Sequence, residues 1–305
     1  MRPSRSFALI LLHKQALAVC LLVLCVPLAY SQEQGEAAPI KTINPTFTTI
    51  DVPGAAYTEA MAIDTVGDIV GSYGRNSASD STGFLYTNGV FTFFSYPGSV
   101  FTIPLGINDS GVIVGHAGQS PVVSFLYDGI GFTTLQDGAD SATFASGINN
   151  AGIIVGGAGT IYTTRAFMMR NGHYRTIKFP GNYVYAQAEA INNFGEIVGY
   201  GDDCGYAIKN GKFRHVEIPG AMRTAALGIN DGSAIAGWYT RSGPCTVLDC
   251  AFVLINGTYY SFAYPGAMGT FATGINNSGK VVGVYLLNDN SLHGFVTDPV
   301  FPELQ

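Results

Sequence analysis

The sequence predicts an all-β fold built from one repeated unit, and three observations predict it. The 305 residues include 39 Gly, 19 Phe and 17 Tyr, and only 12% are charged. A short motif recurs along the chain at nearly even spacing. Turn dipeptides and aromatic-led segments follow each copy, as they do between short strands. This composition is typical of a compact, turn-rich β protein and argues against disorder.

The recurring motif is Asn or Asp, a Gly three residues later, and a second Gly seven residues later. Its copies are Asp64-Gly67-Gly71, Asn108-Gly111-Gly115, Asn149-Gly152-Gly156, Asn192-Gly195-Gly199, Asn230-Gly237 and Asn276-Gly279-Gly283. The fifth copy departs from the pattern, because Ser233 stands at the first Gly position. A repeat of roughly 42 residues indicates one supersecondary unit per copy.

Each copy predicts four short strands. The first strand ends in Ile-Asn, the second holds Ile-Val-Gly, the third holds one aromatic after a small residue, and the fourth begins with Phe or Tyr. Pairs such as Asn88-Gly89 separate the third strand from the fourth and favour a two-residue hairpin turn, since both central residues need positive φ. Four-stranded units of this length are typical of propeller blades. We therefore expect a six-bladed β-propeller over residues 46–298.

Side-chain volume predicts the order of strands within a blade. Small residues precede the Ile of the first strand, namely Ala62, Gly106, Gly147, Ala190, Gly228 and Gly274. Blades crowd together at the axis, so this strand should be innermost and the aromatic-led strand outermost.

The two ends of the repeat region predict how the ring closes. Residues 46–52 form an aromatic-led strand with no blade before it, and the last copy has no such strand after Phe295. We expect the N-terminal strand to complete the last blade and close the ring. An open solenoid is the alternative, and it would leave both ends uncapped.

The N-terminus predicts export. Arg2, Arg5 and Lys14 precede an apolar run over residues 16–29, and small residues at Ala29 and Ser31 suit signal cleavage. The run is shorter than the roughly 20 residues that span a bilayer. We expect residues 1–31 to be a signal peptide, leaving a secreted or periplasmic protein without a membrane span; a retained anchor is the alternative. Residues 32–45 should be a short linker, and residues 299–305 a C-terminal tail.

Charge and cysteine content limit the partners, disulfides and metal sites that the protein is expected to have. The full chain has a net charge of −6, and removal of residues 1–31 leaves 12 basic and 21 acidic residues. An acidic surface argues against nucleic acid as a partner. Cys245 and Cys250 can staple one loop in an oxidising compartment, which would leave Cys204 as a single thiol. No Cys or His spacing suits zinc and no cofactor motif occurs, so we expect neither a metal nor a cofactor.

The repeats resemble those of the extracellular HAF-repeat proteins of bacteria, in which Gly-Ile-Asn, a turn and Ile-Val-Gly precede His-Ala-Phe or His-Gly-Phe. The resemblance covers roughly residues 47–297, and the sixth copy is closest, with Gly274-Ile275-Asn276 and His293-Gly294-Phe295. Other residues replace the His elsewhere, among them Thr82, Arg165, Cys204 and Cys250. The resemblance implies export and a repeat architecture; it implies no activity and no catalytic residue.

The repeated Asn or Asp after Ile suggests either cation binding or a turn. Calcium needs six to eight oxygen ligands, and each copy supplies one acid or amide. We therefore expect a type I turn that Asn begins and Gly ends. His116, His173, His215 and His293 fall at different places in their repeats and form no visible constellation, so we expect each to be a surface or strand residue.

Glu or Gln occurs in the first strand of only two copies. Glu59 lies in the first copy, and Gln187 and Glu189 lie in the fourth, which should face the first across the axis. Aromatic and cationic residues lie just upstream in several copies: Tyr57, Phe101, Tyr185 and Arg223. Together these residues should surround one mouth of the central channel and suit a polar ligand such as a sugar. The alternative is that the carboxylates are only solvated there.

We expect a monomeric, non-catalytic binding module that recognises a glycan or a protein through its loop face. No nucleophile, phosphate-loop or metalloprotease motif occurs, and fold alone does not fix function. A hydrolase or lyase that cleaves polysaccharide with Glu59 and Glu189 is the second hypothesis; glycoside hydrolysis needs two carboxyl groups about 5 to 10 Å apart. A structural component of the cell surface or an adhesin is the third.

Overall fold

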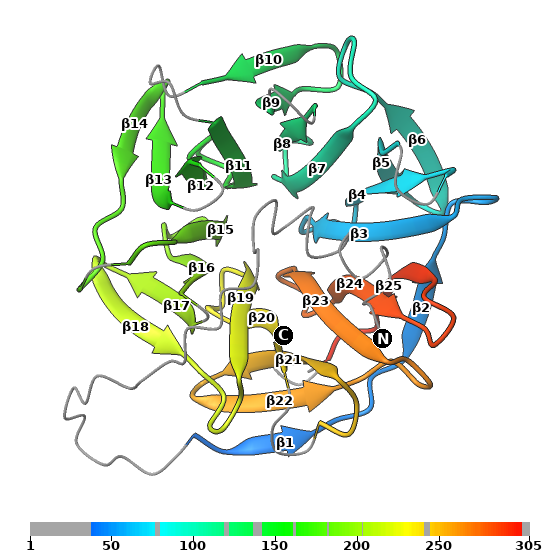
Figure 1. Ribbon diagram of the computed structural model, residues 1–305, viewed down its shortest axis with the longest axis vertical. Coiled ribbons are helices and arrows are strands. Elements are labelled where there is room, and N and C mark those ends of the chain that lie inside the picture. Colours follow the sequence, from blue (N-terminus) through cyan, green and yellow to red (C-terminus); the bar gives the residue numbers. More distant parts are fainter. Residues whose placement is uncertain are drawn as a thin grey trace.

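The computed structural model describes residues 38–76, 80–118, 122–136, 142–160, 163–181, 183–202, 204–240 and 245–300. The expected signal peptide lies outside the described residues, as do residues 32–37 of the expected linker and 301–305 of the tail. Within the described ranges, every helix or strand that the structure contains is a β-strand (Figure 1).

The chain forms successive antiparallel units of four strands, as the repeat predicts. The first unit contains β3 (Tyr57–Ile63), β4 (Ile69–Gly74), β5 (Thr82–Thr87) and β6 (Val90–Phe94). The second contains β7 (Thr102–Ile107), β8 (Ile113–Ala117), β9 (Val123–Tyr127) and β10 (Phe132–Leu135). The third contains β11 (Ala142–Ile148), β12 (Ile154–Gly159), β13 (Thr164–Arg170) and β14 (His173–Thr176).

The fourth unit contains β15 (Gln187–Ile191), β16 (Ile197–Gly201), β17 (Cys204–Lys209) and β18 (Lys212–Val216). The fifth contains β19 (Arg223–Ile229), β20 (Ile235–Thr240), β21 (Asp249–Ile255) and β22 (Thr258–Phe262). The last contains β23 (Gly269–Ile275), β24 (Val281–Leu286) and β25 (Leu292–Thr297).

The N-terminal segment supplies strands to two different units. Strand β2 (Phe47–Ile50) pairs antiparallel with β25, the partner that the sequence predicts, and Thr49 lies opposite Phe295. Strand β1 (Ile40–Thr42) lies inside the expected linker and adds in parallel to β22 (Figure 1). The expected linker over residues 32–45 therefore contains a strand at residues 40–42. A three-residue strand is too short to show an alternating pattern in the sequence.

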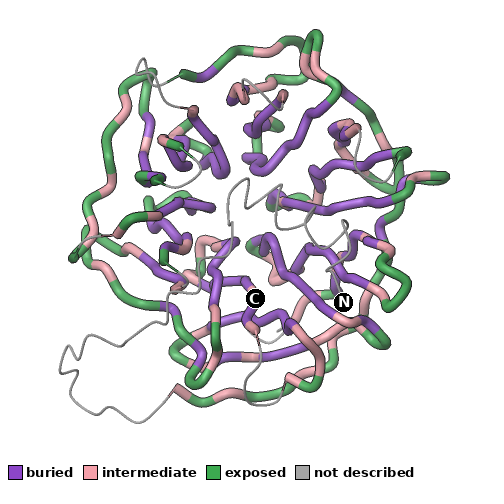
Figure 2. Tube along the Cα trace, viewed as in Figure 1, coloured by how far each residue is buried: buried purple, intermediate pink, exposed green. Residues whose placement is uncertain are grey.

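The units are arranged around a common centre. The first strand of each unit lies nearest the centre and the aromatic-led strands lie at the perimeter (Figure 1). Burial follows this order, since the inner strands are mostly buried and the outer strands mostly exposed (Figure 2). A Cβ at Gly228 would lie 2.7 Å from the Cα of Gly274 in the next unit. The innermost strands approach closely enough to require small residues, as predicted.

Each first strand carries a β-bulge, which explains the second Gly of the motif. In the second unit the register shifts between Pro104 and Gly106, so that Leu105 is the extra residue. The shift directs the carbonyl of Ile103 at Gly115, and a Cβ at Gly115 would overlap that oxygen. The other units share this contact between a bulged strand and Gly: Gly71, Gly156, Gly199, Gly237 and Gly283.

The turns have the predicted chemistry. Asn88 and Gly89 have φ values of 51° and 85°, as the two-residue hairpin turn requires. In the motif turn, the Gly111 N–H donates to the Asn108 carbonyl at 2.9 Å. The Asn108 side-chain oxygen accepts from the N–H of Val112 at 3.0 Å. The prediction that this Asn begins a turn is confirmed.

The motif Asn also connects neighbouring units, which the sequence analysis missed. Its side-chain amide donates to the main-chain carbonyl of the corresponding residue in the next unit. The five links, which we call the amide ladder, are Asn108 to Asn149, Asn149 to Asn192, Asn192 to Asn230, Asn230 to Asn276, and Asn276 to Asp64. Asp64 lacks an amide N–H, so it cannot donate in this way.

Candidate functional site

Two of the predicted ligand-binding residues, Glu59 and Gln187, belong to a belt of cross-strand pairs near the centre. In each unit, the residue four positions before the motif Ile lies opposite the residue that follows Ile-Val-Gly on the second strand. These pairs, which we call the inner belt, are Glu59–Ser72, Ile103–His116, Phe144–Gly157, Gln187–Tyr200, Ala225–Trp238 and Phe271–Val284. The sequence predictions included only first members of these pairs. The signal of the second members was a position that varies between copies directly after a nearly constant Ile-Val-Gly.

The inner belt makes contacts between units. The rings of His116 and Phe144 have centroids 6.1 Å apart, and those of Trp238 and Phe271 are 5.5 Å apart. Belt side chains from neighbouring units therefore pack against each other.

The fourth unit contributes one of the two polar parts of the belt. The Tyr185 hydroxyl donates to the Gln187 side-chain oxygen at 2.9 Å, and the Gln187 amide donates to the Ser146 hydroxyl of the third unit at 3.1 Å. The rings of Tyr185 and Tyr200 are stacked, with centroids 5.8 Å apart and planes 29° apart. Both tyrosines are half-buried. We call Tyr185, Gln187, Glu189 and Tyr200 the tyrosine–carboxylate group.

Burial and charge act together on these phenols. Burial raises the pKa of Tyr185 to about 12, and the negative charge of Glu189 opposes ionisation further. Burial also raises the pKa of Tyr200, with added contributions from Tyr185 and Glu189. At neutral pH both tyrosines are therefore neutral hydroxyls that can donate and accept hydrogen bonds.

A second polar group lies in the first unit. The Ser72 hydroxyl donates to a carboxylate oxygen of Glu59 at 3.2 Å. The Tyr57 hydroxyl donates to the main-chain carbonyl of Asp80 at 2.8 Å. Burial raises the pKa of Tyr57, and the Glu59 charge raises it further. Tyr57 and Glu59 thus interact within their own unit.

The structure separates the predicted site residues into these two groups. Tyr185, Gln187 and Glu189 lie together in the fourth unit, and Tyr57 and Glu59 lie together in the first. Phe101 is buried, with its main chain bridged to Ser81, and half-buried Arg223 begins β19 opposite Thr240.

The expected exposure of the two carboxylates is wrong. Glu59 is 0% exposed and Glu189 is 2% exposed. The first strands approach one another closely, and the belt side chains pack between them. That Glu59 and Glu189 bind a ligand stays a prediction.

His293 lies in a chain of polar contacts that the sequence did not reveal. Its Nδ1 is 2.7 Å from a carboxylate oxygen of Asp51, and its Nε2 is 2.9 Å from the Ser291 hydroxyl. That hydroxyl donates to Asp289 at 2.6 Å. His293 is a strand residue of β25, as expected. Its contact with Asp51 could not be seen in the sequence, because Asp51 is 242 residues away.

This chain differs from the catalytic Ser-His-Asp arrangement in one respect. A nucleophilic serine must donate its proton to the histidine. Ser291 gives its only hydroxyl proton to Asp289, so the contact with Nε2 is satisfied when His293 is the donor. The geometry fits a clasp between the residue after β2 and the hairpin that leads into β25.

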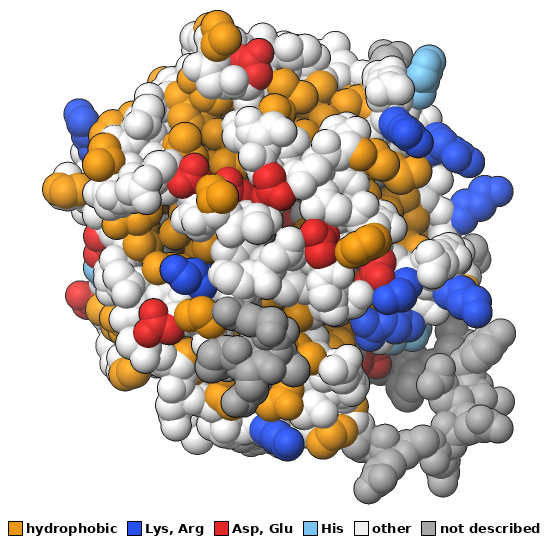
Figure 3. Space-filling model, turned by 180° about the vertical axis from the view of Figure 1, so that it is seen from behind, with side chains coloured by type: hydrophobic (Ala, Val, Ile, Leu, Met, Phe, Trp, Pro, Cys, Tyr) orange, Lys and Arg blue, Asp and Glu red, His pale blue; other side chains and the backbone are white. Residues whose placement is uncertain are grey.

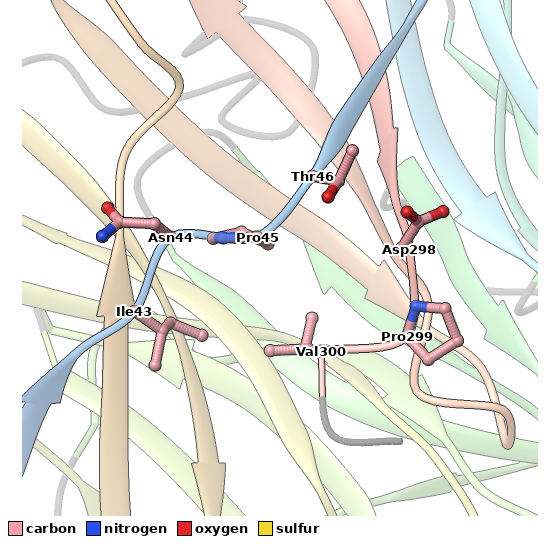
Figure 4. A pocket seen from close by; sticks show the side chains of 7 residues that line it. All are labelled: Ile43, Asn44, Pro45, Thr46, Asp298, Pro299 and Val300. Carbon is pink, nitrogen blue, oxygen red and sulfur yellow. The ribbon is translucent and has the colours of Figure 1, made fainter.

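Two cavities lie outside the inner belt. One, of about 220 Å³, lies between residues 43–46 and residues 298–300, with polar side chains from Asn44, Thr46 and Asp298 (Figure 4). The other, of about 70 Å³, lies where the motif turns meet and is lined by their Ile, Asn and Asp residues. Acidic side chains gather near the middle of one face of the molecule (Figure 3).

In the described part of the chain, no group of three or more His, Cys, Asp or Glu side chains is placed to hold a metal ion. Cys245 and Cys250 form a disulfide with Cα atoms 5.7 Å apart. Across the described ranges there is no helix of the length and apolarity that crossing a membrane requires.

Comparison with solved structures identifies the fold class. The chain is similar to TolB from Acinetobacter baumannii, with a TM-score of 0.52 and 11% identity over 75% of this chain; it spans 63% of TolB. The comparison with YCF48 has a TM-score of 0.46 at 10% identity, and the matched region covers 86% of this chain and 99% of YCF48. The propeller domain of the Trilobed protease from Pyrococcus furiosus gives 0.44 at 12% identity, covering 80% and 82%.

These neighbours are β-propeller proteins, and the antiparallel four-stranded sheets of this chain match that fold. No protein-family model matches the sequence. No curated protein matches it either.

Proposed function

We propose that this protein is an exported, six-bladed β-propeller of the HAF-repeat type that binds a glycan without cleaving it. Residues 1–31 are removed on export, and β2 completes the last blade to close the ring. Strand pairing supports this architecture through the contact of β2 with β25. The Asn276 side chain supports it further by donating to the Asp64 carbonyl at 3.0 Å, which links the last unit to the first.

The tyrosine–carboxylate group is the observation that supports glycan binding. Its half-buried tyrosine rings offer apolar faces for the C–H groups of a sugar ring. Its neutral phenol hydroxyls can donate hydrogen bonds to sugar hydroxyls and accept them. Sites with a few polar groups among aromatic side chains are typical of small-molecule recognition.

Binding is favoured over cleavage because the two carboxylates belong to different groups. Glu59 accepts a hydrogen bond from Ser72 in the first unit, whereas Glu189 lies among the tyrosines of the fourth. A hydrolase needs two carboxyl groups on either side of one glycosidic bond.

The test is thermal unfolding of residues 32–305 with a panel of bacterial and plant glycans. A ligand that binds only the folded protein raises stability by RT ln(1 + [L]/Kd). We expect one glycan class to raise Tm, and Tyr200→Ala to weaken its binding at least about tenfold by removing one ring of the group. Tyr86→Ala, which removes a half-buried tyrosine of β5, is the matched control and should retain the shift.

Two results would overturn the proposal. The absence of a shift with every glycan would favour protein recognition. Release of reducing ends, abolished by Glu189→Gln, would favour the hydrolase.

A further inference from the structure

Strand β6 is an outer strand with an apolar, exposed edge. It pairs with β5 and ends its row of strands in the sheet order. Val90 is 64% exposed and Phe93 is 48% exposed. An exposed apolar edge strand is a template for pairing with another strand.

Equivalent positions show that this edge differs from the others. Phe93 aligns with Thr134, Thr176, His215, Ser261 and Thr49 on the outer strands of the other units. Each of these residues is polar, so only the first unit places a phenylalanine at this outer position.

The remaining edges are charged, bonded or covered. Strands β14 and β18 carry Arg175, Lys212 and Arg214. The Thr134 hydroxyl of β10 bonds to Tyr96, and the Thr49 hydroxyl of β2 bonds to Tyr264. Strand β22 is covered by β1. No charged residue occurs from residue 81 to residue 107, the stretch that contains β6.

The pairing of β1 with β22 shows which main-chain groups of an outer strand face outward. The Tyr259 N–H donates to the Pro39 carbonyl, and the Ser261 carbonyl accepts from the Ile43 N–H, both at 2.9 Å. By strand register, Phe91 and Phe93 are the equivalents of these two residues in β6. Their main-chain groups are therefore directed outward.

We propose that β6 pairs antiparallel with β6 of a second copy of this chain, forming a two-fold dimer. With Phe91 opposite Phe93 of the second copy, the outward N–H and C=O groups form two hydrogen-bonded pairs, related by an axis at Thr92. The uncharged edge meets itself without repulsion, unlike β14 or β18. Because β6 lies at the perimeter, a second molecule can approach from the side (Figure 1). The sequence analysis expected a monomer, and this inference departs from it.

Sedimentation velocity of the exported protein tests the dimer over about 1 to 200 µM, since dimers dissociate on dilution. We expect the mass of two chains at high concentration. Exposed Thr92 faces its copy across the axis, with Cβ atoms roughly 4.5–5.5 Å apart. Thr92→Lys and Thr92→Glu should each weaken association at least about tenfold by like-charge repulsion, and an equal mixture should restore it.

The matched control is Thr133→Lys, which changes the exposed equivalent of Thr92 on β10 and should leave the dimer intact. A wild-type protein that stays a single chain throughout would overturn the proposal. Dimers that persist in Thr92→Lys, or a mixture that fails to associate, would also overturn it.

Discussion

Asp64 stands where the other five motif turns carry Asn. Its side chain accepts hydrogen bonds from the N–H groups of Gly67 and Asp68. Asn108 likewise accepts from its own turn, from the N–H groups of Ser110 and Val112. It has no amide with which to extend the amide ladder to Asn108. Burial raises the pKa of Asp64 above its ordinary value of 3.8, and the charges of Asp68 and Asp109 add to this rise. A carboxylate therefore replaces an amide at a buried site.

Asp64→Asn should stabilise the fold by about 1 kcal/mol at neutral pH, the contribution of one hydrogen bond. The new amide can donate to the Asn108 carbonyl, and the cost of a buried charge disappears. An acid with a raised folded pKa binds its proton more tightly when folded, so ionisation costs stability. The part of the Asp64→Asn stabilisation that comes from removing the charge is thus fully present above the raised pKa of Asp64, and it is lost below pH 3.8. Thermal unfolding at pH 7 and pH 3 measures both contributions.

The reverse change provides the control for Asp64. Asn149→Asp removes the donor that bonds to the Asn192 carbonyl at 3.1 Å and should lower Tm. A lower Tm for Asp64→Asn would contradict the role assigned to the amide ladder.

The turn role of the motif Asn could be predicted from sequence because its partners are two to four residues away. The amide ladder could not be predicted from sequence, because its donors and acceptors are far apart in the chain. Four of the amides donate to a carbonyl 38 to 46 residues further along, and the Asn276 amide donates back to the first unit. A local pattern does not identify such an acceptor.

At the level of strands, the bulge in the first strand of each unit requires a Gly at the facing position of the second strand. Gly115→Ala should destabilise the protein by more than about 3 kcal/mol, because a main-chain carbonyl cannot move aside as a flexible side chain can. Gly131→Ala in the same unit is the control, since a Cβ there meets nothing within 4 Å, and it should change stability by less than about 0.5 kcal/mol. Urea unfolding midpoints compare the two. Equal effects would contradict the bulge as the cause.

Strand order within a unit could be predicted from side-chain volume, because crowding leaves a compositional signal. The bulge was within reach of the same reasoning, since an almost invariant Gly beside a β-branched pair marks a close main-chain approach. Strand β1 was not predictable, because only its position beside β22 makes residues 40–42 a strand.

In the whole molecule, the clasp at His293 attaches the N-terminal strand to the last unit. Asp51→Asn should cost about 0.5–1 kcal/mol, the usual contribution of one hydrogen bond. Loss of the clasp should speed hydrogen exchange of the β2 amides while leaving β10 unchanged. Exchange mass spectrometry reports both strands in one experiment. Unchanged exchange in β2 would mean that strand pairing alone holds this segment.

The predicted site was only partly recoverable from sequence. Gln187 and Glu189 were found because polar residues interrupt an apolar strand, and Tyr185 lies close upstream. Tyr200 and Ser146 were missed because their proximity depends on the pairing of β15 with β16 and on packing between units. Burial of Glu59 and Glu189 likewise depends on packing around the centre.

The amide ladder has a consequence for how such a chain can change its length. Each amide recognises only the main-chain carbonyl of its neighbour, and every turn of the motif presents the same carbonyl. A duplicated repeat would therefore find a donor on one side and an acceptor on the other without any new side chain. The ladder places no limit on the number of repeats.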